Sequence, residues 1–266
     1  MASIVLKFAK IKNYKVDSAF LDRMNDAFKK YGVRHKPPKR VGFKFSLREG
    51  DYVYTRFVKE IKRKMPILDQ ANEEVETTVI PAFGKKIFVF ENGFIAYETS
   101  MQVYTGEIFD AITDAWNIVR ADTEGKLDIE RVDKIDPKTL KLFYAESKIV
   151  VALKIKEIGE KEPNPNVPSE VIKDIIEDAK EKTESVQIKG KIVGVKSQGN
   201  LKEVQIFDEG FVRLSELEEV KGVDREDFAF TISKSGRITS GLPEDPEKQK
   251  NKIIQLCKKV LKFLPV

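Results

Sequence analysis

Residues 86–99, KIFVFENGFIAYET, carry the strongest local structural signal in this chain. Two runs rich in aromatic and β-branched residues stand on either side of Asn92-Gly93. A type I′ turn needs positive φ at both of its central residues, and Asn followed by Gly suits that requirement. The segment therefore predicts a tight hairpin of two antiparallel strands that turn at residues 92–93.

Three segments before the hairpin have the pattern of strands. Residues 3–11 and 41–47 alternate apolar and polar side chains, which predicts half-buried strands. Residues 75–80 are a further strand candidate. The positions expected to point inward from the second of these strands are Val41, Phe43, Phe45 and Leu47.

Three segments have the apolar spacing of amphipathic helices. Residues 17–31 repeat apolar side chains every four positions and end before Gly32, which is a common helix terminator. Residues 51–65 and 108–119 also fit the period of a helix. The positions expected to point inward are Phe20, Met24 and Phe28; Tyr54, Phe57, Val58, Ile61 and Met65; and Ile108, Ala111, Ile112, Ala115, Trp116 and Val119.

A proline-rich segment marks the expected domain boundary. Residues 140–158 are strand-like, and residues 159–168 then hold three prolines among polar residues, which cannot continue a helix or a central strand. We expect an α+β fold of two domains, residues 1–160 and 161–266, with antiparallel hairpin-rich sheets and flanking amphipathic helices. The elements expected after the boundary are a helix that begins at Ser169, short strands at 185–195, 201–207, 210–214 and 227–232, and a terminal helix at 246–263.

The composition excludes several classes of protein. The single cysteine, Cys257, cannot form an intramolecular disulfide. No run of about 18 apolar residues predicts a membrane helix, and Lys7 and Lys10 interrupt the apolar start of the chain, unlike a signal peptide. We therefore expect a cytoplasmic protein that does not contact a membrane. The 34% of charged residues, rich in Lys and Glu, is typical of proteins from thermophilic organisms.

The charges are sorted along the chain. Residues 1–64 carry 18 Lys and Arg against 6 Asp and Glu, a net charge of +12. Residues 65–246 carry a net charge of −12, and residues 247–266 carry +5. A basic surface attracts polyanions and raises the rate of encounter with them. The distribution therefore favours nucleic acid as the partner.

Three basic elements could contact phosphates. The segment 34–40 reads as a loop stiffened by two prolines, the expected helix at 51–65 spaces its basic residues along one side, and the terminal helix exposes lysines. Tyr52, Tyr54 and His35 lie within the basic block and could stack on bases. The expected phosphate contacts are Arg34, Lys36, Lys39, Arg40, Arg56, Lys59, Lys62 and Arg63, with Lys259 and Lys262 as a second patch.

One weak pattern suggests an enzyme. Asp136-Pro137 followed by Glu146-Ser147-Lys148 superficially resembles nucleases of the restriction-endonuclease type, in which carboxylates bind Mg²⁺ and a lysine stabilises the attacking water or the phosphate. The chain contains no Walker A loop, no G-x-G-x-x-G and no G-x-S-x-G motif. Apart from this nuclease alternative, we predict no catalytic residue, no metal ligand and no cofactor.

The charges and the missing motifs together favour a non-catalytic nucleic-acid-binding protein. We expect an accessory subunit that lends a basic lobe to a larger nucleic-acid-processing complex. The alternatives are the nuclease that uses Asp136, Glu146 and Lys148, and a protein–protein interaction scaffold whose basic ends dock on an acidic protein surface. The sequence contains no RNP-type aromatic box, zinc knuckle or GXXG loop, so it leaves open whether the polymer is DNA or RNA.

Overall fold

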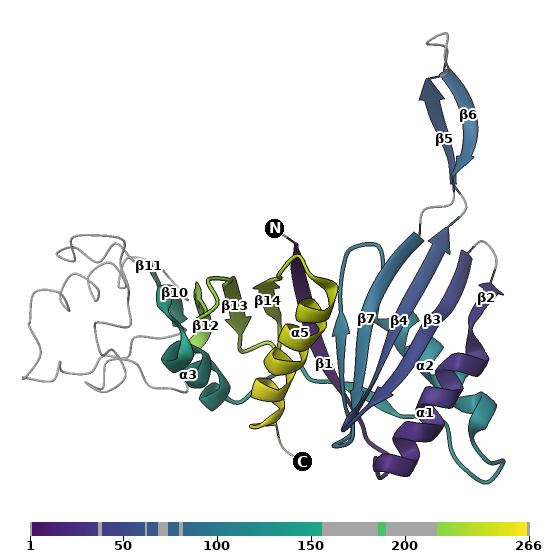
Figure 1. The fold of residues 1–266 in the computed structure, drawn as a ribbon, viewed down its shortest axis with the longest axis horizontal. Coiled ribbons are helices and arrows are strands. Elements are labelled where there is room, and N and C mark those ends of the chain that lie inside the picture. The colour runs from purple at the N-terminus through teal and green to yellow at the C-terminus, as the bar shows by residue number, and fades with distance from the viewer. Residues whose placement is uncertain are drawn as a thin grey trace, which may run out of the picture. The chain divides into compact units, whose positions relative to one another are not determined.

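The computed structural model has the predicted α+β fold, in which helices flank a large antiparallel sheet (Figure 1). The chain forms two compact units, an N-terminal unit of residues 7–131 and a C-terminal unit of residues 1–6 and 132–266. The predicted boundary near residue 160 lies outside the described residues and stays a prediction. The structure describes residues 2–36, 39–61, 63–68, 74–79, 82–155, 186–189 and 217–264.

The N-terminal unit is built on an antiparallel sheet. Its strands lie in the order β1, β8, β7, β4, β3, β2, while β9 pairs with β1, and β5 and β6 pair only with each other. The predicted strands at 3–11, 41–47 and 75–80 correspond to β1, β3 and β6. The bounds are β1 (Ser3–Ile11), β2 (Val33–Lys36), β3 (Lys39–Glu49), β4 (Tyr52–Ile61), β5 (Arg63–Leu68), β6 (Glu74–Val79), β7 (Ala82–Phe90), β8 (Phe94–Glu98) and β9 (Ile129–Arg131).

Helices α1 (Ser18–Tyr31) and α2 (Thr105–Val119) pack on one face of this sheet, as their apolar periods predict. The Asp17 carboxylate caps α1 by accepting a 2.9 Å hydrogen bond from the Phe20 amide, which satisfies one of the unpaired amides at a helix start. Each large apolar side chain buried here stabilises the fold by about 1.5–3 kcal/mol. The shared core includes Phe20, Met24, Phe28, Phe43, Phe57, Ile87, Ile112 and Trp116.

The predicted hairpin at residues 86–99 is confirmed, but its turn is one residue longer than expected. Ile87 pairs with Tyr97 and Val89 with Ile95, so three residues, 91–93, connect the strands β7 and β8. Gly93 has a φ of 83°, whereas Asn92 does not have positive φ. The prediction of a type I′ turn is therefore wrong. Within this turn only the glycine takes the left-handed conformation that a three-residue hairpin loop requires.

The predicted helix at residues 51–65 is wrong, because Tyr52–Ile61 form the central strand β4. Apolar side chains occur on both faces of this strand, and their combined spacing imitates the period of a helix. Its aromatic and β-branched residues favour an extended backbone instead. The predicted loop at 34–40 is also largely wrong, since its described residues belong to β2 and β3, which pair as a hairpin.

The C-terminal unit contains a second set of antiparallel strands. In its described part the order is β11, β10, β12, β13, β14, and the N-terminal half of β1 pairs with β14. The terminal helix α5 (Pro246–Leu261) is confirmed, and it buries Ile253, Leu256, Cys257 and Val260. The strand bounds are β10 (Ile149–Ile155), β11 (Val186–Lys189), β12 (Leu217–Val223), β13 (Ala229–Ser233) and β14 (Ile238–Gly241).

The expected strand at residues 140–158 is wrong in its first half, where α3 (Pro137–Glu146) precedes β10. Asp136 caps this helix by accepting a 2.8 Å hydrogen bond from the Lys138 amide, and Pro137 suits the first helical position. Asp136 and Pro137 therefore marked the start of a helix in the sequence, but the apolar residues that follow led to the prediction of a strand. The expected helix from Ser169 and the strands at 201–207 and 210–214 lie outside the described residues.

Candidate nucleic-acid interface

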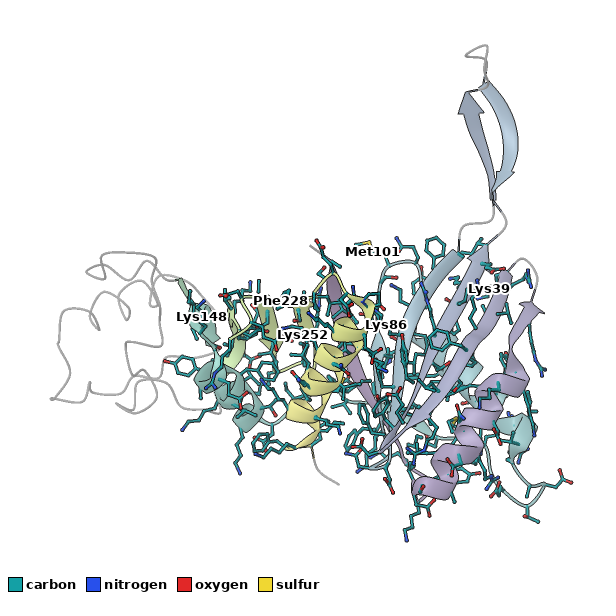
Figure 2. The ribbon with its side chains drawn as sticks, viewed as in Figure 1. Lys39, Lys86, Met101, Lys148, Phe228 and Lys252 are labelled. Carbon is teal, nitrogen blue, oxygen red and sulfur yellow. The ribbon has the colours of Figure 1, made fainter. Side chains whose placement is uncertain are left out.

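The face of β3, β4 and β7 opposite α1 and α2, here called the outer face, carries the exposed basic residues of the central strands. Alternate side chains of a strand point to opposite faces. Val53 and Phe57 on β4 and Ile87 on β7 belong to the core beneath the helices. Arg56 directly precedes Phe57 on β4, and Lys86, which Figure 2 labels, directly precedes Ile87 on β7, so both side chains point to the outer face.

A β-bulge adds two more side chains to this face. The register of β3 against β4 shifts between Phe43 and Ser46, so Lys44 and Phe45 together lie opposite Arg56. Bulges of this kind redirect side chains. Phe45 is 44% exposed, and Leu47 beyond it is 43% exposed. Of the four positions predicted to point inward, Val41 and Phe43 are buried, and the prediction is wrong for Phe45 and Leu47 because the bulge lies between the two pairs.

Three cations therefore lie abreast across three neighbouring strands, and we call them the cation row: Lys44, Arg56 and Lys86. Arg56 and Lys86 are directly opposite one another, an arrangement that destabilises a strand pair by charge repulsion. Arg56 forms no ion pair with any residue that the structure describes. An anion bound between the two side chains would remove this repulsion.

The environment of Lys86 fits such an anion site. Burial lowers the pKa of Lys86, and the positive charges of Arg56 and Lys85 lower it further, against the opposing effect of Glu98. The charged ammonium is thus disfavoured where it stands. A phosphate placed beside Lys86 and Arg56 would favour the charged form of the lysine.

A group of aromatic rings lies next to the cation row on the outer face. Tyr54 stacks on the buried Phe88 with ring centroids 4.8 Å apart. The Phe45 ring meets Tyr54 edge to face, with centroids 5.3 Å apart. The Thr55 hydroxyl donates a 2.5 Å hydrogen bond to the Phe45 carbonyl, which fixes the backbone of the bulge. The exposed ring of Phe45 thus stands on a rigid aromatic support.

Gly84 on β7 provides the space that Arg56 occupies. A Cβ atom at Gly84 would lie 2.4 Å from Arg56 Nε and 2.7 Å from Arg56 Nη2, so the guanidinium covers this glycine closely. Any larger residue at this position forces Arg56 to move. The missing Cβ at Gly84 therefore lets the Arg56 guanidinium lie close against the neighbouring strand, and this planar group can meet a phosphate with two donors.

If this face binds nucleic acid, we expect Gly84→Ala to weaken the binding about three- to tenfold, because the added Cβ displaces the Arg56 guanidinium from its place on the outer face. The fold should persist, since the side chain that must move is flexible. Gly106→Ala is the matched control, because a Cβ at Gly106 meets nothing within 4 Å. Anisotropy titration and thermal melting of both variants provide the test, and equal affinities would show that the position of Arg56 is irrelevant.

Lys59 does not belong to this interface. It lies on the helix-covered side of β4 and is 5% exposed. Its Nζ donates to Glu107 Oε2 at 2.8 Å and to the Gln102 carbonyl at 2.9 Å, and Lys39 (Figure 2) pairs with the other oxygen of Glu107. Burial alone would raise the pKa of Glu107, but the hydrogen bonds from Lys39 and Lys59 hold it below its ordinary value. We therefore remove Lys59 from the proposed phosphate contacts.

The remaining predicted contacts in the N-terminal half differ in their position. Arg40 is exposed at 3.3 Å from Glu60, whose other oxygen is 3.8 Å from Lys44. Arg34 lies over the ring of Tyr31 and donates to its carbonyl at 3.1 Å, so it faces the α1 side of the sheet. Lys62 and the side chains of Lys36 and Arg63 lie outside the described residues.

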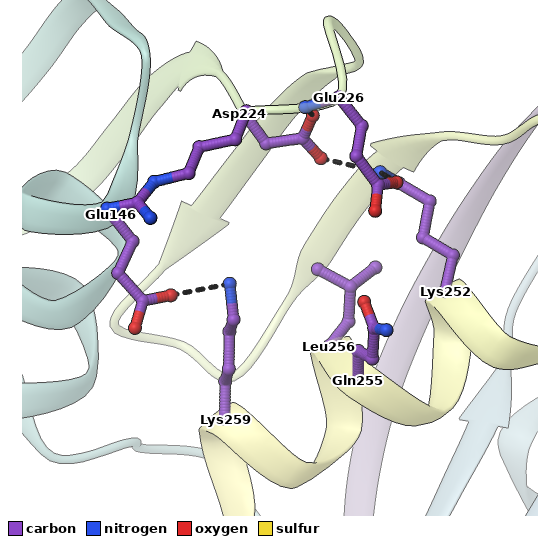
Figure 3. A pocket seen from close by; sticks show the side chains of 8 residues that line it. Glu146, Asp224, Glu226, Lys252, Gln255, Leu256 and Lys259 are labelled. Atoms are coloured by element: carbon purple, nitrogen blue, oxygen red, sulfur yellow. Dashed lines mark hydrogen bonds and ion pairs between the residues drawn. The ribbon is translucent and has the colours of Figure 1, made fainter.

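The second predicted patch belongs to the C-terminal unit and is balanced by acidic groups. Lys259 pairs with Glu146 at 2.6 Å beside an open cavity of about 300 Å³ (Figure 3). In the same cavity Lys252 Nζ lies 2.6 Å from Asp224 and 3.1 Å from Glu226. Lys262 is exposed, with its ammonium 5.6 Å from the ring of Phe263. The cavity thus combines both signs of charge and has no clear preference for an anion.

The residues of the nuclease alternative have structural partners. Asp136 caps α3, and Glu146 lies at the end of that helix rather than on the strand that the pattern requires. Lys148 pairs with Asp227 at 2.5 Å. Within the described residues, no group of three or more His, Cys, Asp and Glu side chains is arranged to hold a metal ion.

Sequence reasoning missed three residues of the candidate interface: Lys44, Phe45 and Lys86. The alternation of residues 41–47 was visible and could have assigned Lys44 to a polar face. Residues 82–90, AFGKKIFVF, do not alternate, so the face of Lys86 follows only from the pairing of β7 with β4. The orientation of Phe45 depends on the bulge, for which the sequence has no glycine or other marker at residues 44–45. That residue could be found only from the register of the paired strands.

Comparison of the sequence with protein-family models and with curated proteins finds no match. In the described part of the chain, none of the helices has both the length and the apolar character that crossing a membrane requires.

Proposed function

We propose that this chain is a non-catalytic nucleic-acid-binding protein and that the outer face of β3, β4 and β7 is its binding surface. The observation that supports the proposal best is the cation row beside the exposed ring of Phe45 on one face of a sheet. Lysine and arginine neutralise phosphates and release counterions, which supplies most of the affinity in nucleic-acid complexes. Aromatic rings add contacts with bases that tolerate any sequence.

The proposal selects the basic residues that lie on the outer face. Arg40 and Arg56 remain phosphate contacts, and Lys44 and Lys86 join them. Lys39 and Arg34 lie on the helix side of the sheet, where each contacts protein groups, and they are left out. The accessory role in a larger complex is part of the proposal, and co-purification of the protein with a nucleic-acid-processing partner would test it.

The test is a titration of labelled DNA and RNA oligonucleotides followed by fluorescence anisotropy at several salt concentrations. We expect Arg56→Glu to weaken binding about tenfold and to reduce the slope of log K against log salt by about 1, because one phosphate contact is lost. Lys29→Glu on the exposed side of α1 is the matched control and should change both quantities little. The absence of binding by the wild-type protein at low salt would overturn the proposal.

A further inference from the structure

We infer that the outer face binds single-stranded nucleic acid, with an unpaired base stacked on Phe45 and its flanking phosphates held by Lys44 and Arg56. This inference rests on the proposed function and goes beyond it, because it names the strandedness of the polymer and the residue that reads it. Three observations about the residues of the bulge and one general property of duplexes support it.

The first observation is the exposure of Phe45 on a strand whose other aromatic residue is buried. Phe43, two positions earlier, is 2% exposed and belongs to the core. Phe45 lies on the other face with 44% of its surface exposed. A large apolar ring beside a second exposed apolar side chain, Leu47, forms a small hydrophobic surface of the kind that contacts ligands.

The second observation is that Phe45 is held rigidly. Its ring is supported at the edge by Tyr54, and Tyr54 in turn stacks on the buried Phe88 at an interplanar angle of 15°. The Thr55 hydroxyl bonds to the Phe45 carbonyl. A ring fixed in this way loses little conformational entropy when a base stacks on it. One face of the Tyr54 ring is covered by Phe88, and Phe45 is the most exposed of these three rings.

The third observation is the spacing between the platform and the cations. The bulge places Lys44 and Phe45, which are consecutive in sequence, together opposite Arg56. A nucleotide places its base and its phosphate on either side of a sugar, and a neighbouring cation and ring match those two groups. The Arg56 guanidinium lies against Gly84 and forms no ion pair with a described residue, so its charge can meet the next phosphate.

The last argument concerns duplexes. In double-stranded nucleic acid the faces of the bases are covered by their neighbours in the stack. A ring on a sheet reaches them only if the helix is opened, which costs a few kcal/mol per unstacked step. Single strands present their bases freely, and proteins that bind them combine a basic surface with aromatic platforms. Phe45 therefore gives an advantage in affinity only for an unpaired strand.

The experiment compares three probes of about 12 nucleotides: a single strand, the corresponding duplex, and an abasic strand that keeps the phosphates. DNA and RNA versions of the first probe distinguish the two polymers. We expect Phe45→Ala to weaken single-strand binding about 5- to 100-fold, which is the range for one stacked base. The same substitution should leave binding of the abasic strand unchanged. Leu47→Ala, an equally exposed apolar change on the same strand, should have a much smaller effect.

The replacement Phe45→Trp adds a direct readout. Indole should preserve single-strand binding, and its fluorescence should be quenched when a base stacks on it, against the constant background of the buried Trp116. If Arg56→Glu weakens binding while Phe45→Ala does not, the proposed function stands and this inference is overturned. If the duplex binds as tightly as the single strand, the inference is also overturned. If no probe binds, both fail together.

Discussion

Substitution of Glu107 by alanine should destabilise the protein by about 3 kcal/mol, because it leaves the buried Lys59 ammonium without its counter-charge. Lys59 and Glu107 are 2.8 Å apart, and the side chain of Lys59 is 7% exposed. Removing one partner of a buried pair leaves a charge that water cannot solvate. Glu107 also pairs with Lys39 and accepts a hydrogen bond from the Tyr104 amide at the start of α2, so a single substitution breaks several contacts.

The matched control for this prediction is an exposed pair in the same unit. Lys12 and Glu130 are 2.5 Å apart, with about half of each side chain exposed. Such pairs contribute about 0–1 kcal/mol. Equilibrium unfolding in denaturant should therefore show a large loss for Glu107→Ala and a small one for Glu130→Ala. Equal losses would mean that the buried network does not stabilise the fold.

The stability should also depend on pH through Glu107. The pKa of Glu107 is lowered in the folded state. Its contribution is therefore complete above the ordinary value of 4.5 and is lost as the pH falls below that value. The variant Glu107→Gln cannot ionise at this position. Its free energy of unfolding, measured in denaturant, should therefore change less between about pH 5 and about pH 3 than that of the wild-type protein.

Lys59 shows how a correct charge count can lead to a wrong residue. The sequence placed it beside Arg56 in a basic stripe, because a helical period puts positions 56 and 59 on one side. In the strand β4 these positions point to opposite faces. One of them reaches solvent, and the other is buried in an ion-pair network with α2. The composition of the basic block was informative, but only the type of element decides which of its charges face outward.

The fold itself was predictable where one local pattern dominated. Strand β1, helices α1 and α2, the β7–β8 hairpin and helix α5 follow from periodicity and capping residues. The predictions failed at β4 and α3, where apolar residues occur on more than one side of the element. Tertiary contacts decide such cases: β4 lies between β3 and β7 with both faces covered over part of its length. The sequence of a single segment does not show which strands or helices will pack against it.

Simultaneous reversal of Lys44, Arg56 and Lys86 to glutamate should weaken nucleic-acid binding about a thousandfold at low salt, because each lost phosphate contact costs about tenfold. The three side chains lie abreast on neighbouring strands, so one strand of nucleic acid crossing the sheet would meet all of them. The slope of log K against log salt should fall by about 3 in this variant, because three phosphate contacts are lost. Lys15, Lys29 and Lys30, which are exposed on or beside α1, provide a control triple.

Both triples change the charge of the protein equally, from +5 to −1. If affinity depended on the net charge alone, through long-range attraction, the two variants would lose the same amount. A local binding surface predicts instead that the reversal on the outer face abolishes binding and that the reversal near α1 reduces it only severalfold. Circular dichroism should show that both variants are folded. Equal losses of affinity in the two variants would mean that binding depends on the basic N-terminal segment as a whole. The outer face would then not be the binding surface.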